Sequence, residues 1–376
     1  LQLGFGGHYA ALAREHRALL SKVNPTYALY SAAKLAVQTA SAPSVRERVA
    51  VGNDAVVPHS DPDRELVIMV VGEAARADHW SLNGYHKLTN PLLSQEDVVN
   101  FPNFWSCGTS TAWSVPCMFS KLGREAFDPD KGGAQDNALD VLNRAGVSVL
   151  WRDNNSSSKG VAVRVPYADF KTPRNNPMCD DVECRDEGML QGLQDYIDAQ
   201  KGDILIVLHQ MGNHGPAYYK RYPKSFERFA PVCRTNDLGS CSKEEISNAY
   251  DNAILYTDYF LSKIIQLLKA NDSSFETAMF YVSDHGESLG EYGLYLHGMP
   301  YALAPEAQKH VPAVMWFGHY KKNDLFLNFL DERRQRHWSH DNVFATLLGL
   351  FEIKSRAYDE RLDVLVHKHN EIAHSN

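Results

Sequence analysis

An aspartate and a histidine stand side by side, as Asp284 and His285, where an apolar run of the sequence ends. A carboxylate beside an imidazole offers two of the ligand types that zinc accepts, and Gly286 permits a sharp turn that aims both at one point. A capped turn with a surface histidine is the alternative interpretation. Glu73 ends another apolar run, and its carboxylate needs a partner because burying an unpaired charge is costly. These three side chains predict a cation site that keeps a position for a further ligand.

A short segment between Cys107 and Cys117 carries hydroxyl side chains that could serve as a nucleophile at this site. A hydroxyl is a weak nucleophile at its ordinary pKa, and coordination to a metal can activate it. Hydroxyl clusters also commonly cap helices, so the residues by themselves leave the choice open. The four candidates are Thr109, Ser110, Thr111 and Ser114.

Groups that suit phosphoryl oxygens follow the apolar run that ends near residue 153. The stretch WRDNNSSSKG places Asn154, Asn155 and Lys159 close together in a loop. Amide N–H groups and a lysine ammonium donate hydrogen bonds to phosphoryl oxygens. The alternative is a solvated loop of serine and asparagine.

Two more histidines could reach the same site. His214 follows His209 within the stretch HQMGNHGPAYYKRYP, for which a turn histidine is the alternative. His297 follows the Asp-His pair by twelve residues and could fold back to the same place.

Five short apolar runs must position these groups. Nearly continuous apolar runs are typical of strands buried on both faces, and helical patterns lie between several of them. The alternation predicts an α/β domain with a largely parallel central sheet and helices on both faces, in which ligands bind outside the carboxyl ends of the strands. The runs cover residues 66–73, 147–154, 203–210, 277–286 and 311–318. The polar residues at their ends are Glu73, Asp153, His209 and the pair Asp284 and His285.

Helical patterns complete the coarse organisation. The clearest covers residues 242–271, where Ser242 and Glu245 predict a capping box before an apolar stripe. Another helix is expected over residues 339–351. Residues 1–60 hold two shorter helical patterns and a polar, turn-rich stretch that is typical of a linker.

Length and charge restrict the class of protein. The 376 residues suffice for one large domain or two ordinary ones. No apolar run approaches the roughly 18–20 residues of a membrane-spanning helix. The first fifty residues carry six Lys and Arg against two Asp and Glu, whereas the whole chain has a net charge of −8, which argues against nucleic acid as a partner. Because the first residue is Leu, we expect a fragment or a processed product.

The six cysteines fall into three close pairs, each of which could close a small loop. An even count with local spacing predicts three disulfides and an oxidising compartment. Six reduced cysteines in a cytosolic protein are the alternative. The pairs are Cys107 with Cys117, Cys179 with Cys184, and Cys233 with Cys241.

Six motifs occur in the order VVGEAARADHWSLNGY, SCGTSTAWSVPCMFS, WRDNNSSSKG, HQMGNHGPAYYKRYP, SDHGESLGEYGLYLHG and SHDNVFATLLGLF. In these motifs the chain resembles the phosphoethanolamine transferases of the alkaline phosphatase and sulfatase superfamily, and most of all the lipid A enzymes, which include the transferable colistin-resistance type. The resemblance covers about residues 61–366 and extends to LLSKVNPTYALYSAAKLA in the lead-in. It implies an alkaline-phosphatase-like sandwich, with residues 61–376 as a periplasmic catalytic domain. It also implies that residues 1–60 are a membrane-proximal linker from an N-terminal membrane domain that the sequence lacks.

The resemblance also assigns roles to the candidate residues. The family's nucleophile matches Thr111, which decides among the four hydroxyls. The family's zinc ligands fall on Glu73, Thr111, Asp284 and His285.

Outside the ligand set, the resemblance assigns four further positions. His214 and His297 match histidines that act in catalysis and bind the phosphoethanolamine group or a second, weaker zinc. Asn155 and Lys159 match residues of the phosphoryl pocket.

The function implied by this resemblance is zinc-dependent transfer of phosphoethanolamine from phosphatidylethanolamine to lipid A through a covalent threonine intermediate. The implied location is the periplasmic face of the Gram-negative inner membrane, and the implied state is a monomer. The added positive charge on lipid A would give resistance to polymyxins such as colistin.

Several alternatives stay open at this point. They are a related phosphodiesterase, a sulfatase, a phosphoglycerol transferase, a transferase acting on core heptose or another envelope glycan, and a non-enzymatic binding domain. Sulfatases need a modifiable Cys or Ser in the pattern C/S-x-P-x-R, whereas Thr111 is followed by Ala112. A structural zinc site is usually closed, which disfavours the binding domain.

Overall fold

The computed structural model describes residues 48–58, 63–319 and 333–365, and the single positions 28, 31, 32, 321 and 330. Its strands are β1 (Glu65–Gly72), β2 (Val98–Trp105), β3 (Ser148–Asp153), β4 (Tyr167–Asp169), β5 (Ile204–His209), β6 (Glu276–Ser283), β7 (Ser288–Leu289), β8 (Tyr295–Leu296), β9 (His310–Phe317) and β10 (Trp338–Ser339). Its α-helices are α4 (Thr111–Met118), α5 (Gly123–Ala126), α6 (Pro129–Gly133), α7 (Ala138–Ala145), α8 (Leu193–Ala199), α9 (Lys243–Asn271) and α12 (Val343–Leu350).

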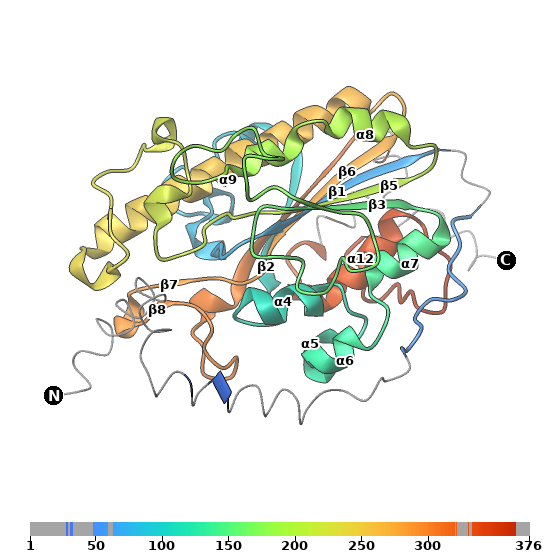
Figure 1. Ribbon diagram of the computed structural model, residues 1–376, viewed down its shortest axis with the longest axis horizontal. Helices are drawn as coiled ribbons and strands as arrows, with labels where there is room; N and C mark the ends of the chain where they lie inside the picture. The colour runs from blue at the N-terminus through green and yellow to red at the C-terminus, as the bar shows by residue number, and fades with distance from the viewer. Residues whose placement is uncertain are drawn as a thin grey trace.

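Eight of the strands form one sheet in the order β10-β2-β9-β6-β1-β5-β3-β4, and β7 and β8 form a separate hairpin. Figure 1 shows α8 and α9 on one side of this sheet and α4, α7 and α12 on the other. The predicted central sheet with helices on both faces is confirmed. The five predicted runs are β1, β3, β5, β6 and β9.

Strand β1 shows why an uninterrupted apolar run suits the centre of this sheet. Because successive side chains point to opposite faces, Val67, Met69 and Val71 enter the core that contains residues of α4, α7 and α12. The alternate positions, such as Ile68 and Val70, enter a second core that contains residues of α8 and α9. Both faces of β1 are therefore buried, as the sequence predicts.

The pairing of the strands brings their carboxyl ends together. Strand β1 runs parallel to β5 and β6, with Val71 opposite His209 and Gly72 opposite Ser283. Strand β9 runs antiparallel to both β6 and β2, so the sheet is largely but not wholly parallel. Glu73 and Asp284, the residues that directly follow Gly72 and Ser283, consequently leave the sheet side by side.

The helices predicted over residues 242–271 and 339–351 are both present, the second with a shifted start. Helix α9 is capped by Ser242, whose side chain accepts from the Glu245 N–H in the predicted capping box. The late helix, α12, begins at Val343 rather than at residue 339, because residues 338–342 form β10 and a 3-10 turn. No helix within the described ranges has both the length and the apolar character to cross a membrane. The helices predicted within residues 1–60 fall almost wholly outside the described residues, and the boundary near residue 60 stays a prediction.

All three predicted disulfides are present. Their partners are Cys107 with Cys117, Cys179 with Cys184, and Cys233 with Cys241. The first of them ties the loop before α4 to the helix itself.

Candidate active site

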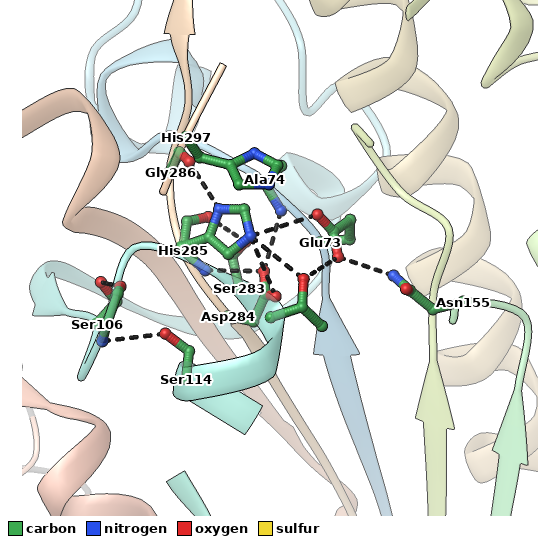
Figure 2. A network of polar contacts seen from close by, with 12 residues as sticks. Glu73, Ala74, Ser106, Ser114, Asn155, Ser283, Asp284, His285, Gly286 and His297 are labelled. Atoms are coloured by element: carbon green, nitrogen blue, oxygen red, sulfur yellow. Dashed lines mark hydrogen bonds and ion pairs between the residues drawn. The ribbon is translucent and has the colours of Figure 1, made fainter. Parts of the chain in front are cut away.

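Three predicted ligands meet just beyond the ends of β1 and β6. The ligand atoms of Glu73, Asp284 and His285 all lie within 4.8 Å of one another. His285 Nε2 is 3.5 Å from Glu73 Oε1 and 3.4 Å from Asp284 Oδ2. All three residues are buried, and Figure 2 shows their polar ends pointing toward one another.

Backbone contacts fix the direction of two of these ligands. His285 Nδ1 lies 2.8 Å from the Gly286 carbonyl oxygen. Because a carbonyl can only accept, Nδ1 carries the hydrogen and Nε2 keeps a free lone pair. Asp284 Oδ1 accepts from the N–H groups of Ala74 and His285, which leaves Oδ2 facing the cluster.

Thr111 is the first residue of α4 and reaches the same cluster. Its Oγ1 donates to Glu73 Oε2 over 3.0 Å and lies 3.3 Å from His285 Nε2. The hydroxyl also stands at the start of a helix, where free N–H groups favour an anion. The position suits an oxygen that must become negatively charged.

Two of the other three hydroxyls of this segment are engaged elsewhere. Thr109 Oγ1 donates to the Met299 carbonyl, and Ser114 Oγ accepts from the Gly108 N–H. Ser110 is the N-cap of α4 but makes no side-chain capping bond. Of the four candidates, the described contacts bring only Thr111 to the ligand cluster.

The cluster fits a divalent cation. Glu73 Oε1 and Asp284 Oδ2 are buried and have no hydrogen-bond partner among the described residues. Burial raises the pKa of Asp284 well above its usual range, and the charge of Glu73 raises it further. Burial also opposes ionisation of Glu73, but His285, His214 and His297 outweigh it and lower this pKa to about 2. Two carboxylate oxygens without a hydrogen-bond partner, beside an imidazole nitrogen that carries no hydrogen, are the kinds of ligand that zinc takes.

Asn155 and Lys159 lie on the predicted loop after β3 but make different contacts. Asn155 Nδ2 donates to Glu73 Oε2 over 2.8 Å and to the Gln210 carbonyl over 2.7 Å. Lys159 Nζ instead donates to Ser156 Oγ. The described contacts therefore join Asn155, and not Lys159, to the ligand cluster.

The two remaining strand-end residues, Asp153 and His209, pair with each other. His209 Nδ1 lies 3.0 Å from Asp153 Oδ2, and both residues are fully buried. Asp153 Oδ1 accepts from the Asn155 N–H, so this pair supports the residue that contacts Glu73.

The two predicted substrate histidines border the cluster. The ring of His297 lies 4.1 Å from that of His285 and 6.2 Å from that of His214, measured between centroids. His297 Nδ1 is 3.2 Å from Glu287 Oε1. Burial opposes the charged form of His297, but Glu287 outweighs it and raises the pKa to about 9.

Comparisons with known proteins decide the family. Residues 65–353 match the sulfatase family model. The chain is 47% identical over 370 residues to phosphatidylethanolamine transferase Mcr-1 of Escherichia coli, which covers 96% of this chain and 67% of that protein. The chain belongs to the phosphoethanolamine transferases.

Two solved structures of lipooligosaccharide phosphoethanolamine transferase A from Neisseria meningitidis share the fold of this transferase. The soluble domain matches with a TM-score of 0.82 and 41% identity over 86% of this chain and 98% of that one. The integral membrane protein matches with a TM-score of 0.84 and 39% identity over 95% of this chain and 68% of that one. The transferase thus spans about two thirds of the length of its full-length relatives.

Some residues that shape the transferase's site escaped the sequence interpretation. Ser283 Oγ accepts from the Ala75 N–H and donates to the His285 carbonyl, which ties the ends of β1 and β6 together. The Tyr250 hydroxyl accepts from the Arg76 N–H and donates to the Ala74 carbonyl. The position of Ser283 directly before the Asp-His pair could have indicated its role. Tyr250 lies within the apolar stripe of α9, and this pattern predicts only a core residue.

Proposed function

We propose that this chain catalyses zinc-dependent transfer of phosphoethanolamine from phosphatidylethanolamine to lipid A, with Thr111 as the nucleophile. The observation that carries the proposal is the contact of Thr111 Oγ1 with Glu73 and His285, residues from three separate segments. Glu73, Asp284, His285 and Thr111 Oγ1 would hold the zinc. When bound, zinc would act as a Lewis acid that lowers the pKa of a hydroxyl and stabilises negative charge on phosphoryl oxygens.

In the first step, Thr111 Oγ1 forms a bond to the phosphorus of phosphatidylethanolamine while the bond from phosphorus to the diacylglycerol oxygen breaks. Glu73 Oε2 accepts the hydrogen bond of the Thr111 hydroxyl and so orients its lone pairs. Diacylglycerol leaves as an alcohol after it takes a proton from a ring nitrogen of His214 or His297, which border the cluster. Phosphoethanolamine is then esterified to Thr111.

In the second step, a phosphate oxygen of lipid A attacks the same phosphorus, and the bond to Thr111 Oγ1 breaks. Thr111 releases its hydroxyl proton to solvent in the first step. The threonine oxygen and the histidine that protonated diacylglycerol each take a proton back from solvent, and the enzyme returns to its starting state. Asn155 keeps Glu73 in place through both steps by its hydrogen bond to Oε2. Lys159 would turn from Ser156 toward the phosphoryl oxygens. Two displacements at one nucleophile predict ping-pong kinetics.

The same proposal sets the place and the consequence of the reaction. The three disulfides support an oxidising compartment, which we take to be the periplasmic face of the Gram-negative inner membrane. A phosphoethanolamine group added to lipid A brings a positive charge, so cationic peptides such as colistin would bind less well. The enzyme would act as a monomer.

Mass spectrometry of the purified protein tests the nucleophile. Incubation with phosphatidylethanolamine micelles should add one phosphoethanolamine group to the peptide that contains Thr111. Thr111→Ala should abolish this adduct, whereas Thr109→Ala, which removes a hydroxyl bonded to Met299, should keep it. An adduct that persists in Thr111→Ala would rule out this nucleophile.

The acceptor is tested by supplying lipid A together with the donor. Transfer to lipid A should raise its mass by one phosphoethanolamine group and regenerate unmodified protein. Release of free phosphoethanolamine with no modified lipid would instead indicate a phosphodiesterase. Modification only of a lipopolysaccharide core that carries heptose would indicate a different acceptor.

A further inference from the structure

His340 connects the two catalytic segments from a third part of the chain. It begins the 3-10 turn His340–Asn342 that precedes α12, and its side chain is fully buried. Its Nδ1 accepts from the Cys107 N–H over 3.0 Å. Its Nε2 lies 3.0 Å from the Ser283 carbonyl oxygen. One ring thus spans the distance between the nucleophile loop and the end of β6.

The two contacts require a single form of the ring. Nδ1 accepts from an N–H and therefore carries no hydrogen, while Nε2 faces a carbonyl and must donate. Only the neutral tautomer with hydrogen on Nε2 satisfies both. Burial lowers the pKa of His340 to about 3, which agrees with a neutral ring.

Both residues that His340 contacts are linked to residues of the proposed active site. Cys107 is bonded to Cys117 within α4, the helix that begins with Thr111. Ser283 precedes Asp284 and, through its Oγ, also binds the backbone of His285. A change in the separation of the Cys107 N–H and the Ser283 carbonyl would move the nucleophile relative to its ligands.

The turn that carries His340 is itself held in place. Ser339 and Asn342 form a reciprocal capping box around it. Asp341 Oδ1 accepts from the Arg124 N–H in α5, which follows the nucleophile helix. The ring therefore sits on a fixed support and can act as a spacer.

We propose that His340 is a positioning residue that sets the distance between Thr111 and the ligands at the end of β6. Its role in the reaction rests on the proposed function, whereas its role as a spacer does not. In the described contacts the ring bonds to Cys107 and Ser283 and not to the Thr111 hydroxyl or the ligand side chains, so its effect is exerted through these two residues. A displacement of about 1 Å in such geometry can cost about 10²-fold in rate.

Two substitutions each remove one of the two hydrogen bonds of the His340 ring. His340→Asn keeps an acceptor near the position of Nδ1 and loses the donor to Ser283. His340→Gln keeps a donor near the position of Nε2 and loses the acceptor for Cys107. The matched control is His310→Gln. Like His340, His310 donates from Nε2 to a backbone carbonyl, that of Pro102, and each of the two rings lies beside an aromatic ring.

Steady-state rates are measured with a fluorescent phosphatidylethanolamine in detergent micelles, per folded molecule, with zinc content determined in parallel. Both His340 variants should lose about 10- to 100-fold in kcat with KM within about two-fold of the parent value, and the control should keep both. Folded His340 variants that keep the parent kcat would overturn the proposal, as would losses that appear only in folded yield.

Hydrogen exchange at the Cys107 amide gives a second readout that needs no activity. Exchange should accelerate at least about ten-fold in His340→Gln, which lacks the acceptor, and stay slow in His340→Asn. Equal protection in both variants would contradict the spacer. Should the parent protein transfer no phosphoethanolamine, the proposed function fails, while the exchange pattern still decides the role of His340.

Discussion

The two ends of the neighbouring strands β1 and β6 carry the same kind of side chain in different surroundings. At their starts, Glu65 stands opposite Glu276, and the ammonium group of the buried Lys321 contacts both carboxylates. At their far ends, Glu73 and Asp284 are also buried next to each other. No lysine or arginine within the described ranges forms an ion pair with either of them.

The difference supports the proposal that the ends of β1 and β6 near Glu73 and Asp284 take a cation from solution. Burial opposes the charge of Lys321, but Glu65 and Glu276 outweigh it and raise its pKa, so the chain itself supplies the positive charge at that end. At the other end, Glu73 Oε1 and Asp284 Oδ2 have no hydrogen-bond partner among the described residues and lie beside the ring of His285. Burying two adjacent carboxylates without a cation is costly, which supports the proposal that a metal ion binds at this end.

The end with Glu73 and Asp284 is called the open end, and the end where Lys321 lies between Glu65 and Glu276 is called the closed end. Removal of one carboxylate from the open end should have the largest effect. Glu73→Gln keeps the shape of the side chain but removes a charge, so zinc content should fall below one equivalent and the transfer rate should drop at least about 10³-fold. Zinc is measured by elemental analysis after dialysis. The matched control at the closed end, Glu276→Gln, should keep its zinc and its rate per folded molecule. Full zinc occupancy in Glu73→Gln would remove Glu73 from the ligand set.

Removal of the built-in cation from the closed end should reduce stability and leave the chemistry alone. Lys321→Met leaves Glu65 and Glu276 buried without their lysine, which should lower the free energy of unfolding by about 3–5 kcal/mol. Urea denaturation at neutral pH measures this loss. Lys269→Met, which breaks an exposed pair with Glu96, should cost no more than about 1 kcal/mol. A Lys321 variant with less zinc than the parent would show that the two ends are coupled.

A smaller effect is expected from the residue that holds Glu73. Asn155→Ala removes the hydrogen bond to Glu73 Oε2 but no ligand, so zinc affinity and transfer rate should each fall about 10- to 100-fold. Competition with a chelator of known affinity measures the first quantity. Asn175→Ala serves as the control, because Asn175 is exposed and its side chain binds only the Asp169 carbonyl in the described contacts. Parent-like zinc affinity in Asn155→Ala would mean that Glu73 is held without it.

The open end could be predicted from local sequence because its ligands directly follow buried strands. The apolar runs that end in Glu73 and in Asp284 and His285 contain both the strand and the ligand. The choice of Thr111 could not be made from the residues, because all four hydroxyls have the same chemistry and differ only in direction. The resemblance to a family supplied that choice, and the contact with Glu73 supports it.

Other features depend on contacts between distant segments. Strand β2 was not predicted, since Pro102 and polar Asn100 and Asn103 interrupt its apolar pattern, and its register shifts between Phe101 and Phe104. The reversed direction of β9 is not encoded in its own run, which is as apolar as those of the parallel strands. His340 meets Cys107 across 233 positions, and no local pattern signals that contact.

The smallest effect is expected at Asp258 on α9. In the described contacts this buried carboxylate has neither a lysine or arginine partner nor a place in the ligand cluster. It accepts only the N–H groups of Leu92 and Leu93 in the described contacts, and burial raises its pKa to about 7 in spite of them. The folded protein therefore binds a proton that the unfolded chain releases above about pH 4, so stability should fall as the pH rises toward 7. Between pH 5 and pH 7 the free energy of unfolding of the parent should decrease by about 1–2 kcal/mol more than that of Asp258→Asn, as measured by urea denaturation. Parallel pH curves for the two proteins would show that the N–H groups alone suffice for a buried carboxylate, and the proposal that the open end takes a cation would then rest on the zinc measurements.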